Sequence, residues 1–534
     1  MRKKKQLQKI RDNWGKPIDD YRNFYLIDRF AKLQVAPSFH TLSPQTLADI
    51  DFNSLFEYLD RTTTKPGQQY LYNKLIHPTN NVQALKTFDK QVDFFAQDAR
   101  LRENIQLQMT PLSNHSAYYL SSLLQENVYQ KPSWAFLLTV DAVIVVLMVL
   151  FSFKFPVLLI WLLIPLTINI LLHLWNKNKA NDFVRSLPQL NNLINISKKL
   201  CKEAIPFDTA PIQKSASVFQ SFQRRLLLLG MSQTPVLDEM KMAALFIFEL
   251  FKALFLLEVR AFFSCMDDIS QKREQIILLF SFVGSVDAAI STASVRAGAK
   301  YCKPVFTASD KALNTLHIYH PLIENCTTNS IAIKDKSILI TGSNMSGKTT
   351  FIRTVAINSI LAQSIYTCFA ESFTSLVLKV ASSIKIEDNL LEQTSYYLQE
   401  VTTIHELINA SAQQAQYLFV IDEVFKGTNT VERVAAGKAV LSYLNKKNNL
   451  VIVSTHDIEL SDLLKEEYDL YHFEEQIIND ALTFDHLLKP GKLKTRNAIK
   501  LLELSGYPRE VVEEARMITG YPNGSLGDKL PNAE

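Results

Sequence analysis

A glycine-rich segment with one lysine and two threonines carries the residue types that most directly indicate chemistry. Residues 337–350 form a short apolar strand that runs into the pattern G-x-x-x-x-G-K-T, and a helical pattern begins at Phe351. In such a loop the backbone N–H groups surround phosphates, the lysine reaches the β- and γ-phosphates, and the first threonine binds Mg²⁺. The segment therefore predicts a nucleotide-phosphate loop that consists of Gly342, Ser343, Asn344, Met345, Ser346, Gly347, Lys348, Thr349 and Thr350.

Two further apolar strands end in residues that suit this site. Residues 417–421 are followed by Asp422 and Glu423, and a strand from Leu450 ends at His456. Ligands of open α/β sheets bind at the carboxyl ends of the strands, so these side chains are expected to meet the loop. Asp422 is then the second Mg²⁺ ligand beside Thr349. Glu423 is the base that activates water, and His456 is a γ-phosphate sensor, which makes Lys348, Glu423 and His456 the catalytic set. The alternatives are a solvated acidic loop and a structural histidine.

The elements ahead of this site are predicted to be helical. Apolar residues recur at helical spacing from about residue 45 to 130, with a break at residues 60–67, where a proline and a glycine stand beside threonines that can cap the next helix. Long helical patterns return from about 180 to 310. One of them, residues 242–263, is very apolar but carries four charged residues and is therefore read as an amphipathic helix.

Two apolar runs separate the helical regions. They cover Trp134 to Phe153 and Phe155 to Trp175, and about 20 residues of helix suffice to cross a hydrocarbon core of about 30 Å. We predict a transmembrane hairpin over residues 134–175, with a pair of buried helices in a soluble domain as the alternative. Lysines 131, 177 and 179 flank the hairpin against one lysine in its turn, so both ends are expected in the cytoplasm.

Asp141 is the one acidic residue of the first run, and an acidic side chain at such a depth needs a partner. In an antiparallel hairpin its depth is matched near residue 168 of the returning helix. We therefore predict a hydrogen bond between Asp141 and Asn169.

Composition adds less to the functional interpretation. The formal net charge is +4 over 534 residues, which neither requires nor excludes nucleic acid. Five scattered cysteines without C-x-x-C spacing fit neither a disulfide framework nor a zinc site, and they indicate a reducing compartment. The basic start, Met1-Arg-Lys-Lys-Lys, has no apolar stretch behind it and is therefore not a secretory signal. It is expected to be a solvated tail or, alternatively, a contact to anionic lipid or nucleic acid.

The motifs taken together resemble the MutS family of ABC-type ATPases. Residues 340–353 look like the family's phosphate loop, residues 422–430 like its acidic strand end and Gly-Thr loop, and residues 454–456 like its switch histidine. Residues 394–400 are similar to its signature segment, which places the signature serine and glutamate at Ser395 and Glu400, with Thr394 as the other candidate for the serine. Weaker similarity to the family's core, to the segment leading into the ATPase and to its closing helical region covers residues 59–67, 282–293, 320–323, 487–499 and 504–508.

This resemblance implies a fold, cofactors and partners. The fold class is an α/β P-loop NTPase of ABC type, the MutS C-terminal domain, preceded by an all-α core or lever domain with an inserted transmembrane hairpin. The expected cofactors are ATP and Mg²⁺, and the expected assembly is a homodimer in which Ser395 and Glu400 contribute to nucleotide binding. The domains are a basic segment 1–44, core helices 45–130, the hairpin 134–175, further core helices 180–315, and the ATPase with its dimerisation region 316–525.

The resemblance implies only part of the family's DNA-related function. No room for a mismatch-reading domain exists before residue 45, no N-terminal Phe-x-Glu wedge is found, and the hairpin stands where the family has its DNA clamp. Mismatch recognition is therefore not expected. The chain is interpreted as an ATPase at the inner, cytoplasmic membrane that binds DNA, or alternatively as a mechanochemical ATPase acting on a protein or lipid partner.

Overall fold

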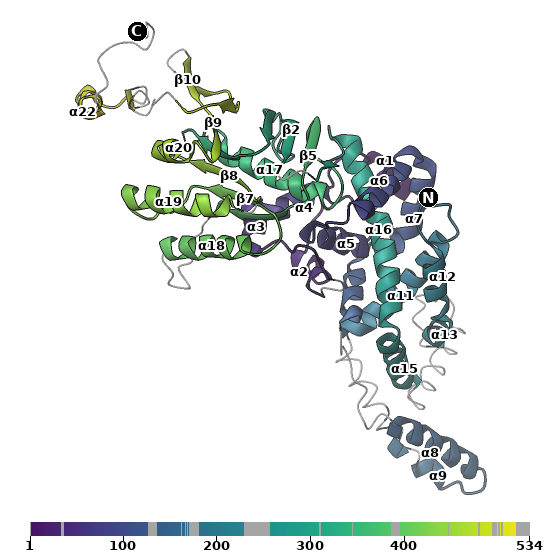
Figure 1. The fold of residues 1–534 in the computed structure, drawn as a ribbon. Helices are drawn as coiled ribbons and strands as arrows, with labels where there is room; N and C mark the ends of the chain where they lie inside the picture. Colours follow the sequence, from purple (N-terminus) through teal and green to yellow (C-terminus); the bar gives the residue numbers. More distant parts are fainter. Residues whose placement is uncertain are drawn as a thin grey trace. The chain divides into compact units, whose positions relative to one another are not determined.

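The structure is a computed structural model of the 534-residue chain. It describes residues 2–33, 37–125, 136–161, 163–165, 167, 169, 181–228, 257–308, 311–343, 345–385, 396–446, 448–478, 481–493, 499, 502–503 and 506–519. The chain divides into two compact units, the first comprising Met1–Thr41 with Phe56–Ala299 and the second Leu42–Leu55 with Lys300–Glu534 (Figure 1).

The first unit is helical and is organised around one long central helix. This helix, α16 (Arg273–Gly298), buries apolar side chains such as Phe280, Val283 and Val286 along its length. It packs against α5 (Lys65–Ile76), α6 (Val82–Gln97), α11 (Asn181–Leu200) and α12 (Ala210–Ser217). The other helices of the unit are α1 (Arg2–Asp12), α2 (Phe24–Ile27), η1 (Ala31–Leu33), α7 (Ala99–Met109), η2 (Thr110–Leu112), η3 (His115–Leu124), α8 (Leu137–Ser152), α9 (Leu158–Trp161), α13 (Gln220–Leu228) and α15 (Leu257–Gln271). The helical interpretation of this region is confirmed.

The predicted helix break and threonine cap before α5 are also confirmed. Thr64 is the N-cap of α5, and its hydroxyl accepts a hydrogen bond from the backbone N–H of Gly67. Asp287 of α16 accepts hydrogen bonds from the backbone N–H groups of Thr63 and Thr64. A Cβ atom on Gly67 would lie 2.1 Å from a carboxylate oxygen of Asp287, so only glycine permits this approach between α5 and α16.

The basic N-terminal segment differs from the solvated tail that its composition suggests. Residues 2–12 form α1, which packs against α7, and Arg11 forms a salt bridge of 2.8 Å with Glu103. Gly298 lies so close to the loop after α1 that an added Cβ would approach the carbonyl oxygen of Gly15 to 1.7 Å. This contact needs glycine at position 298, and Gly15 has φ +79°, so the signal lies in two glycines and not in the charge pattern.

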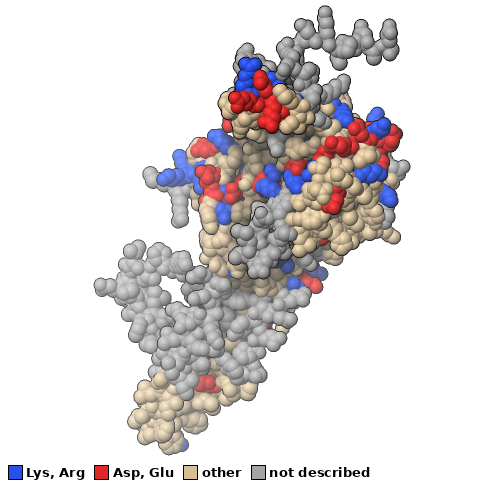
Figure 2. All heavy atoms as spheres, turned by 90° about the vertical axis from the view of Figure 1, so that its left-hand side faces the viewer, with Lys and Arg blue, Asp and Glu red and all other residues tan. Residues whose placement is uncertain are grey.

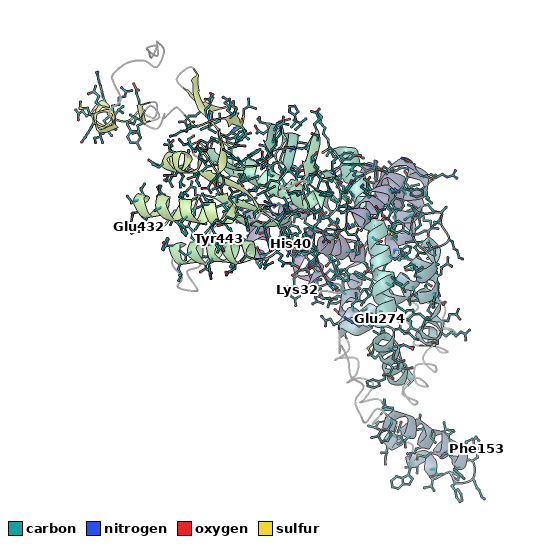
Figure 3. The ribbon with its side chains drawn as sticks, viewed as in Figure 1. Lys32, His40, Phe153, Glu274, Glu432 and Tyr443 are labelled. Carbon is teal, nitrogen blue, oxygen red and sulfur yellow. The ribbon has the colours of Figure 1, made fainter. Side chains whose placement is uncertain are left out.

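The apolar hairpin is described in part. Its described helices are α8 and α9, and the amide of Asn169 donates a hydrogen bond of 2.9 Å to the carboxylate of Asp141, which confirms the predicted pair. Large apolar side chains of the hairpin are exposed, and Figure 3 shows Phe153 pointing away from its ribbon. Within the described residues, the one helix long and apolar enough to cross a membrane is α16, which is mostly buried in the first unit. The described helices of the hairpin fall short of that length, and residues 134, 135, 162, 166, 168 and 170–175 lie outside the described part.

The second unit is built on a six-stranded sheet with the order β12-β9-β4-β8-β7-β6. Strands β4 (Ser337–Thr341), β6 (Lys379–Ser383), β7 (Tyr417–Asp422), β8 (Leu450–Thr455) and β9 (Tyr468–His472) are parallel, and β12 (Lys489–Pro490) pairs antiparallel with β9. The three strands predicted to carry the site are therefore confirmed as neighbours in one parallel sheet.

Helices cover both faces of this sheet (Figure 1). Helix α17 (Lys348–Ala362) packs against β6, β7 and β8. On the other face, Phe419 and Val451 join one apolar cluster with buried side chains of α18 (Tyr396–Ser411), α19 (Thr430–Leu444) and α20 (Ile458–Leu464). A second sheet has the order β1-β5-β2-β3, with β1 (Val305–Phe306), β2 (Leu313–Ile318), β3 (Asn329–Ile333) and β5 (Ser372–Ser375). The remaining elements are α3 (Pro44–Asp49), α4 (Phe52–Leu59), the hairpin β10 (Glu475–Ile478) with β11 (Ala481–Phe484), and α22 (Arg509–Thr519).

Candidate functional site: a nucleotide-phosphate loop at the edge of a parallel sheet

The loop between β4 and α17 has the backbone that its two glycines permit. Gly347 has φ +111° and Gly342 has φ +154°, conformations that disfavour a side chain. A Cβ on Gly342 would also lie 2.8 Å from the carbonyl oxygen of Phe473. Helix α17 begins directly after Gly347, so its N-terminal N–H groups and positive dipole end face the loop.

Lys348 is the first residue of α17, and its ammonium is held inside the loop. It donates hydrogen bonds of 2.7 Å to the carbonyl oxygens of Gly342 and Ser343, and it lies 3.5 Å from Nε2 of His456. Burial lowers the pKa of Lys348 to about 8, although Asp422 and Glu423 act in the opposite direction. A buried ammonium whose bonds are to neutral carbonyls is available to an anionic phosphate.

The predicted Mg²⁺ ligands lie together. The hydroxyl of Thr349 donates a hydrogen bond of 2.6 Å to one carboxylate oxygen of Asp422, and the Ser454 hydroxyl donates to the other. Asp422 ends β7 and Thr349 begins α17, so the pair connects the sheet edge to the phosphate loop. A hydroxyl and a carboxylate are oxygen ligands of the kind that Mg²⁺ prefers, with further positions left to phosphate and water.

Glu423 and His456 also meet, which the spacing of their strands predicted. Oε1 of Glu423 lies 2.9 Å from Nε2 of His456, and its Oε2 lies 3.3 Å from the ammonium of Lys426. Burial alone would raise the pKa of Glu423, but hydrogen bonds and charge from His456 and Lys426 outweigh it and lower the pKa below its usual value. Glu423 has φ +63°, a strained backbone for this residue type, and its N–H donates to the carbonyl of Ser454.

Glu400 takes a place that sequence reasoning did not foresee. Its carboxylate is buried and accepts hydrogen bonds from the backbone N–H groups of Lys426, at 2.9 Å, and Gly427, at 3.4 Å. Within one chain Glu400 therefore stabilises the loop that follows β7. It contacts this loop and not Lys348 or Thr349. Its predicted companion Ser395 lies outside the described residues, as does Asn344 of the phosphate loop.

A pocket of about 300 Å³ opens in front of the phosphate loop. Ser343, Met345, Thr349 and Thr350 line it on one side, and the buried hydroxyl of Ser343 has no hydrogen-bond partner among the described residues. The other walls come from segments that no motif marked: the β2–β3 connection with Ile323, Asn325, Cys326 and Thr327, together with Phe473 and His486. Nδ1 of His486 lies 3.0 Å from the carbonyl oxygen of Ser346.

This arrangement fits a nucleoside triphosphate with Mg²⁺. The orphaned Ser343 hydroxyl, the buried ammonium of Lys348 and the Thr349–Asp422 pair all lie on the phosphate side, and the pocket beside them has room for further atoms of the ligand. A parallel sheet with such a loop at one strand end and an acidic pair at another defines the second unit as a P-loop nucleotide-binding domain.

Comparison with known proteins shows which P-loop nucleotide-binding domains this chain is similar to. Residues 338–521 match the family described as MutS domain V. The chain is 27% identical to the DNA mismatch repair protein MutS of Natronomonas pharaonis over 274 residues, 49% of this chain and 32% of that protein. It is 30% identical to the DNA mismatch repair protein MutS of Carboxydothermus hydrogenoformans over 272 residues, 48% of this chain and 32% of that protein. The protein of the same name from Lactobacillus gasseri is 28% identical over 296 residues, 52% of this chain and 34% of that protein.

The domain that carries the phosphate loop matches MutS domain V, a P-loop ATPase domain, and the chain is similar to MutS proteins over about half its length. The matched region covers about a third of the length of each of these relatives.

Proposed function

We propose that this chain binds and hydrolyses ATP as a homodimer attached to a membrane, and that its ATPase cycle is coupled to DNA. The observation that carries the ATPase part is the meeting of Lys348, the Thr349–Asp422 pair and the Glu423–His456 pair at one sheet edge. Each of the five residues comes from a strand end or a helix start, so the sheet holds the set rigidly.

Each side chain then has a defined part in hydrolysis. Lys348 leaves the loop carbonyls and binds phosphate oxygens, while the N–H groups at the start of α17 hold the same phosphates. Thr349 and Asp422 hold Mg²⁺, which neutralises charge on the phosphates when it is bound. Glu423 orients the attacking water and accepts its proton, since its lowered pKa keeps it ionised at neutral pH. His456 holds Glu423 in position and lies close enough to Lys348 to respond to the phosphate that Lys348 binds.

A second copy of the chain is proposed to complete each site. Met345 in the phosphate loop is 82% exposed, and Val431 at the start of α19 is 81% exposed. Both are apolar and lie in segments next to the nucleotide residues, where association of two ATPase domains would bury them. Ser395 of the signature segment is the residue proposed to reach the partner's phosphates. Glu400 supports this contact by fixing the loop at Lys426.

The hairpin is proposed as the membrane attachment, with the ATPase domain in the cytoplasm. Sixteen apolar residues from Phe136 to Ile164 are 43–87% exposed, and the described atoms of the hairpin are mostly uncharged in Figure 2. The Asp141–Asn169 hydrogen bond satisfies the polar group that would otherwise face hydrocarbon. An apolar surface of this extent is costly in water and is stable in lipid.

DNA is proposed as the ligand because the curated relatives are named as DNA mismatch repair proteins. The described face in Figure 2 carries interspersed Lys, Arg, Asp and Glu side chains, so its charge does not single out a DNA-binding stripe. The test is the ATPase rate of detergent-purified protein with and without duplex, mismatched and branched DNA over a range of salt.

The blank in this assay is Lys348→Ala, which removes the phosphate-binding ammonium. Stimulation by DNA that falls steeply with salt supports contact with the phosphate backbone. Hydrolysis that no DNA alters would reject DNA and direct attention to a protein or lipid partner. Turnover equal to that of Lys348→Ala would reject the ATPase itself.

A further inference from the structure

A second cavity lies wholly within the first unit and has no part in the nucleotide site. Its volume is about 410 Å³. Helix α1 and the segment after it, the loop before α5, helix α7 and Ser294 of α16 form its walls. The close approach of Gly15 to Gly298 and the Arg11–Glu103 salt bridge hold α1 in place beside it.

Three cations line this cavity, Lys9, Arg61 and Lys65, against one carboxylate, that of Asp20. Among the described residues, the ammonium groups of Lys9 and Lys65 form no ion pair and no hydrogen bond. The Lys65 ammonium lies 5.0 Å from the centre of the Tyr118 ring. The nearby carboxylate of Asp60 pairs instead with Arg22 at 3.2 Å. Among the lining side chains three cations therefore face one carboxylate, while Asp60 and Asp287 lie close enough to Lys65 to offset part of its charge.

Arg61 is the most deeply buried of the three cations. It is 4% exposed, and Nη1 donates to the carbonyl oxygen of Ser294, but its Nε has no hydrogen-bond partner among the described residues. Burial lowers the pKa of Arg61, and burial likewise lowers the pKa of Lys65. Burying cations costs free energy unless an anion compensates them.

A neutral polar group accompanies the cations. Gln106 of α7 is 7% exposed, lines the same cavity and donates through Nε2 to the Thr63 hydroxyl at 3.4 Å. Its Oε1 has no hydrogen-bond donor among the described residues. Cations thus offer donors to an acceptor-rich group, and Gln106 offers an acceptor to a hydroxyl or amino group.

We propose that this cavity binds a small phosphate-bearing metabolite that also carries hydroxyl groups. A phosphate monoester has a charge of about −1.5 to −2 at neutral pH and several acceptor oxygens, which suits a lining in which three cations face one carboxylate. The guanidinium of Arg61 and the ammonium of Lys65 bind the phosphate, and Gln106 accepts from a hydroxyl. Occupation ties α1 to the start of α5 and to α7.

The test uses ribose 5-phosphate as the probe and calorimetry of the full chain in detergent. All proteins carry Lys348→Ala, so that the phosphate loop does not contribute. We expect saturable binding of ribose 5-phosphate, no binding of ribose, and affinity about tenfold weaker in Lys65→Gln, because one charged contact is lost. Lys9→Gln weakens binding less, since that side chain is exposed.

The matched control is Lys4→Gln, which removes the same charge from the same helix at a residue that does not line the cavity. Circular dichroism and the melting temperature without probe verify that each variant is folded. Absence of saturable binding, or equal affinity in Lys65→Gln and Lys4→Gln, would overturn the proposal. Displacement of the probe by a short DNA duplex at equal phosphate concentration would also overturn it, by assigning the cations to a nucleic-acid backbone.

Discussion

The buried ammonium of Lys348 makes nucleotide affinity depend on pH in a range where lysine is normally inert. Its pKa is lowered from 10.5 to about 8 by burial, and only the protonated form can pair with phosphate. Binding of a nucleotide adds negative charge next to the ammonium and therefore raises this pKa. Nucleotide binding above pH 7 must then take up a proton, and affinity must fall as pH rises.

The size of the effect follows from the fraction of protein in which Lys348 is neutral. With a pKa of about 8, that fraction is roughly one tenth at pH 7, one half at pH 8 and nine tenths at pH 9. The dissociation constant for a non-hydrolysable ATP analogue with Mg²⁺ should therefore rise about tenfold from pH 7 to pH 9. With an ordinary lysine pKa of 10.5 it would change by only about 3% over the same range.

The assay is isothermal calorimetry at pH 7, 8 and 9 in two buffers of different ionisation enthalpy. At pH 8 the difference between buffers should report uptake of about half a proton per nucleotide bound. The internal control is Lys426→Gln, because Lys426 is one of the charges that lower the pKa of Lys348. In that variant the loss of affinity should begin at higher pH, while any titration of the nucleotide itself is unchanged.

Two results would refute the reasoning. A dissociation constant that stays level from pH 7 to pH 9, without buffer-dependent heat, would mean that Lys348 remains charged throughout. A fall in affinity with the same midpoint in Lys426→Gln would mean that another group titrates.

Three further variants test other parts of the structure. Glu423→Gln should bind ATP normally but turn over at least about 100-fold more slowly in a phosphate-release assay, and unchanged turnover would remove Glu423 from the role of base. Glu400→Ala should leave two backbone N–H groups without an acceptor and speed hydrogen exchange at Lys426 and Gly427 by about tenfold or more, and equal exchange would argue against this stabilisation of the loop. Asn169→Leu should lower the thermal stability of the hairpin by removing the partner of Asp141, measured by melting in detergent, and an unchanged melting temperature would show that the bond contributes nothing.

The core of the candidate site was predictable because its residues sit in fixed relation to regular elements. A strand that runs into glycines and a lysine, followed by a helical pattern, leaves few alternatives for where Lys348 and Thr349 lie. Parallel strands end at a common edge, so Asp422 and His456 had to approach that loop once their strands were recognised. The distances of 2.6 Å from Thr349 to Asp422 and 2.9 Å from Glu423 to His456 agree with that topology.

The rest of the pocket was not predictable from spacing. Phe473 follows β9, and His486 follows the β10–β11 hairpin, more than a hundred residues after the phosphate loop that they contact. Neither Phe473 nor His486 belongs to a sequence motif that is known to contact a phosphate loop. The conformation of the segment after β9 that carries them depends on tertiary packing. Glu400 shows a different limit, since its identity was expected but its partners, two backbone N–H groups of the loop after β7, depend on how that loop closes.

The hydrogen-bonded pair of the hairpin, unlike the walls of the pocket, could be predicted from spacing. Its residues are nearly all apolar, so two polar side chains at matching depth are expected to pair, and an equal rise per residue in both helices sets which two they are. Asp141 and Asn169 were paired by that count alone, and the structure places them 2.9 Å apart. The hydrogen bond links the two arms of the hairpin at one position, so its loss should loosen their pairing without altering the phosphate loop.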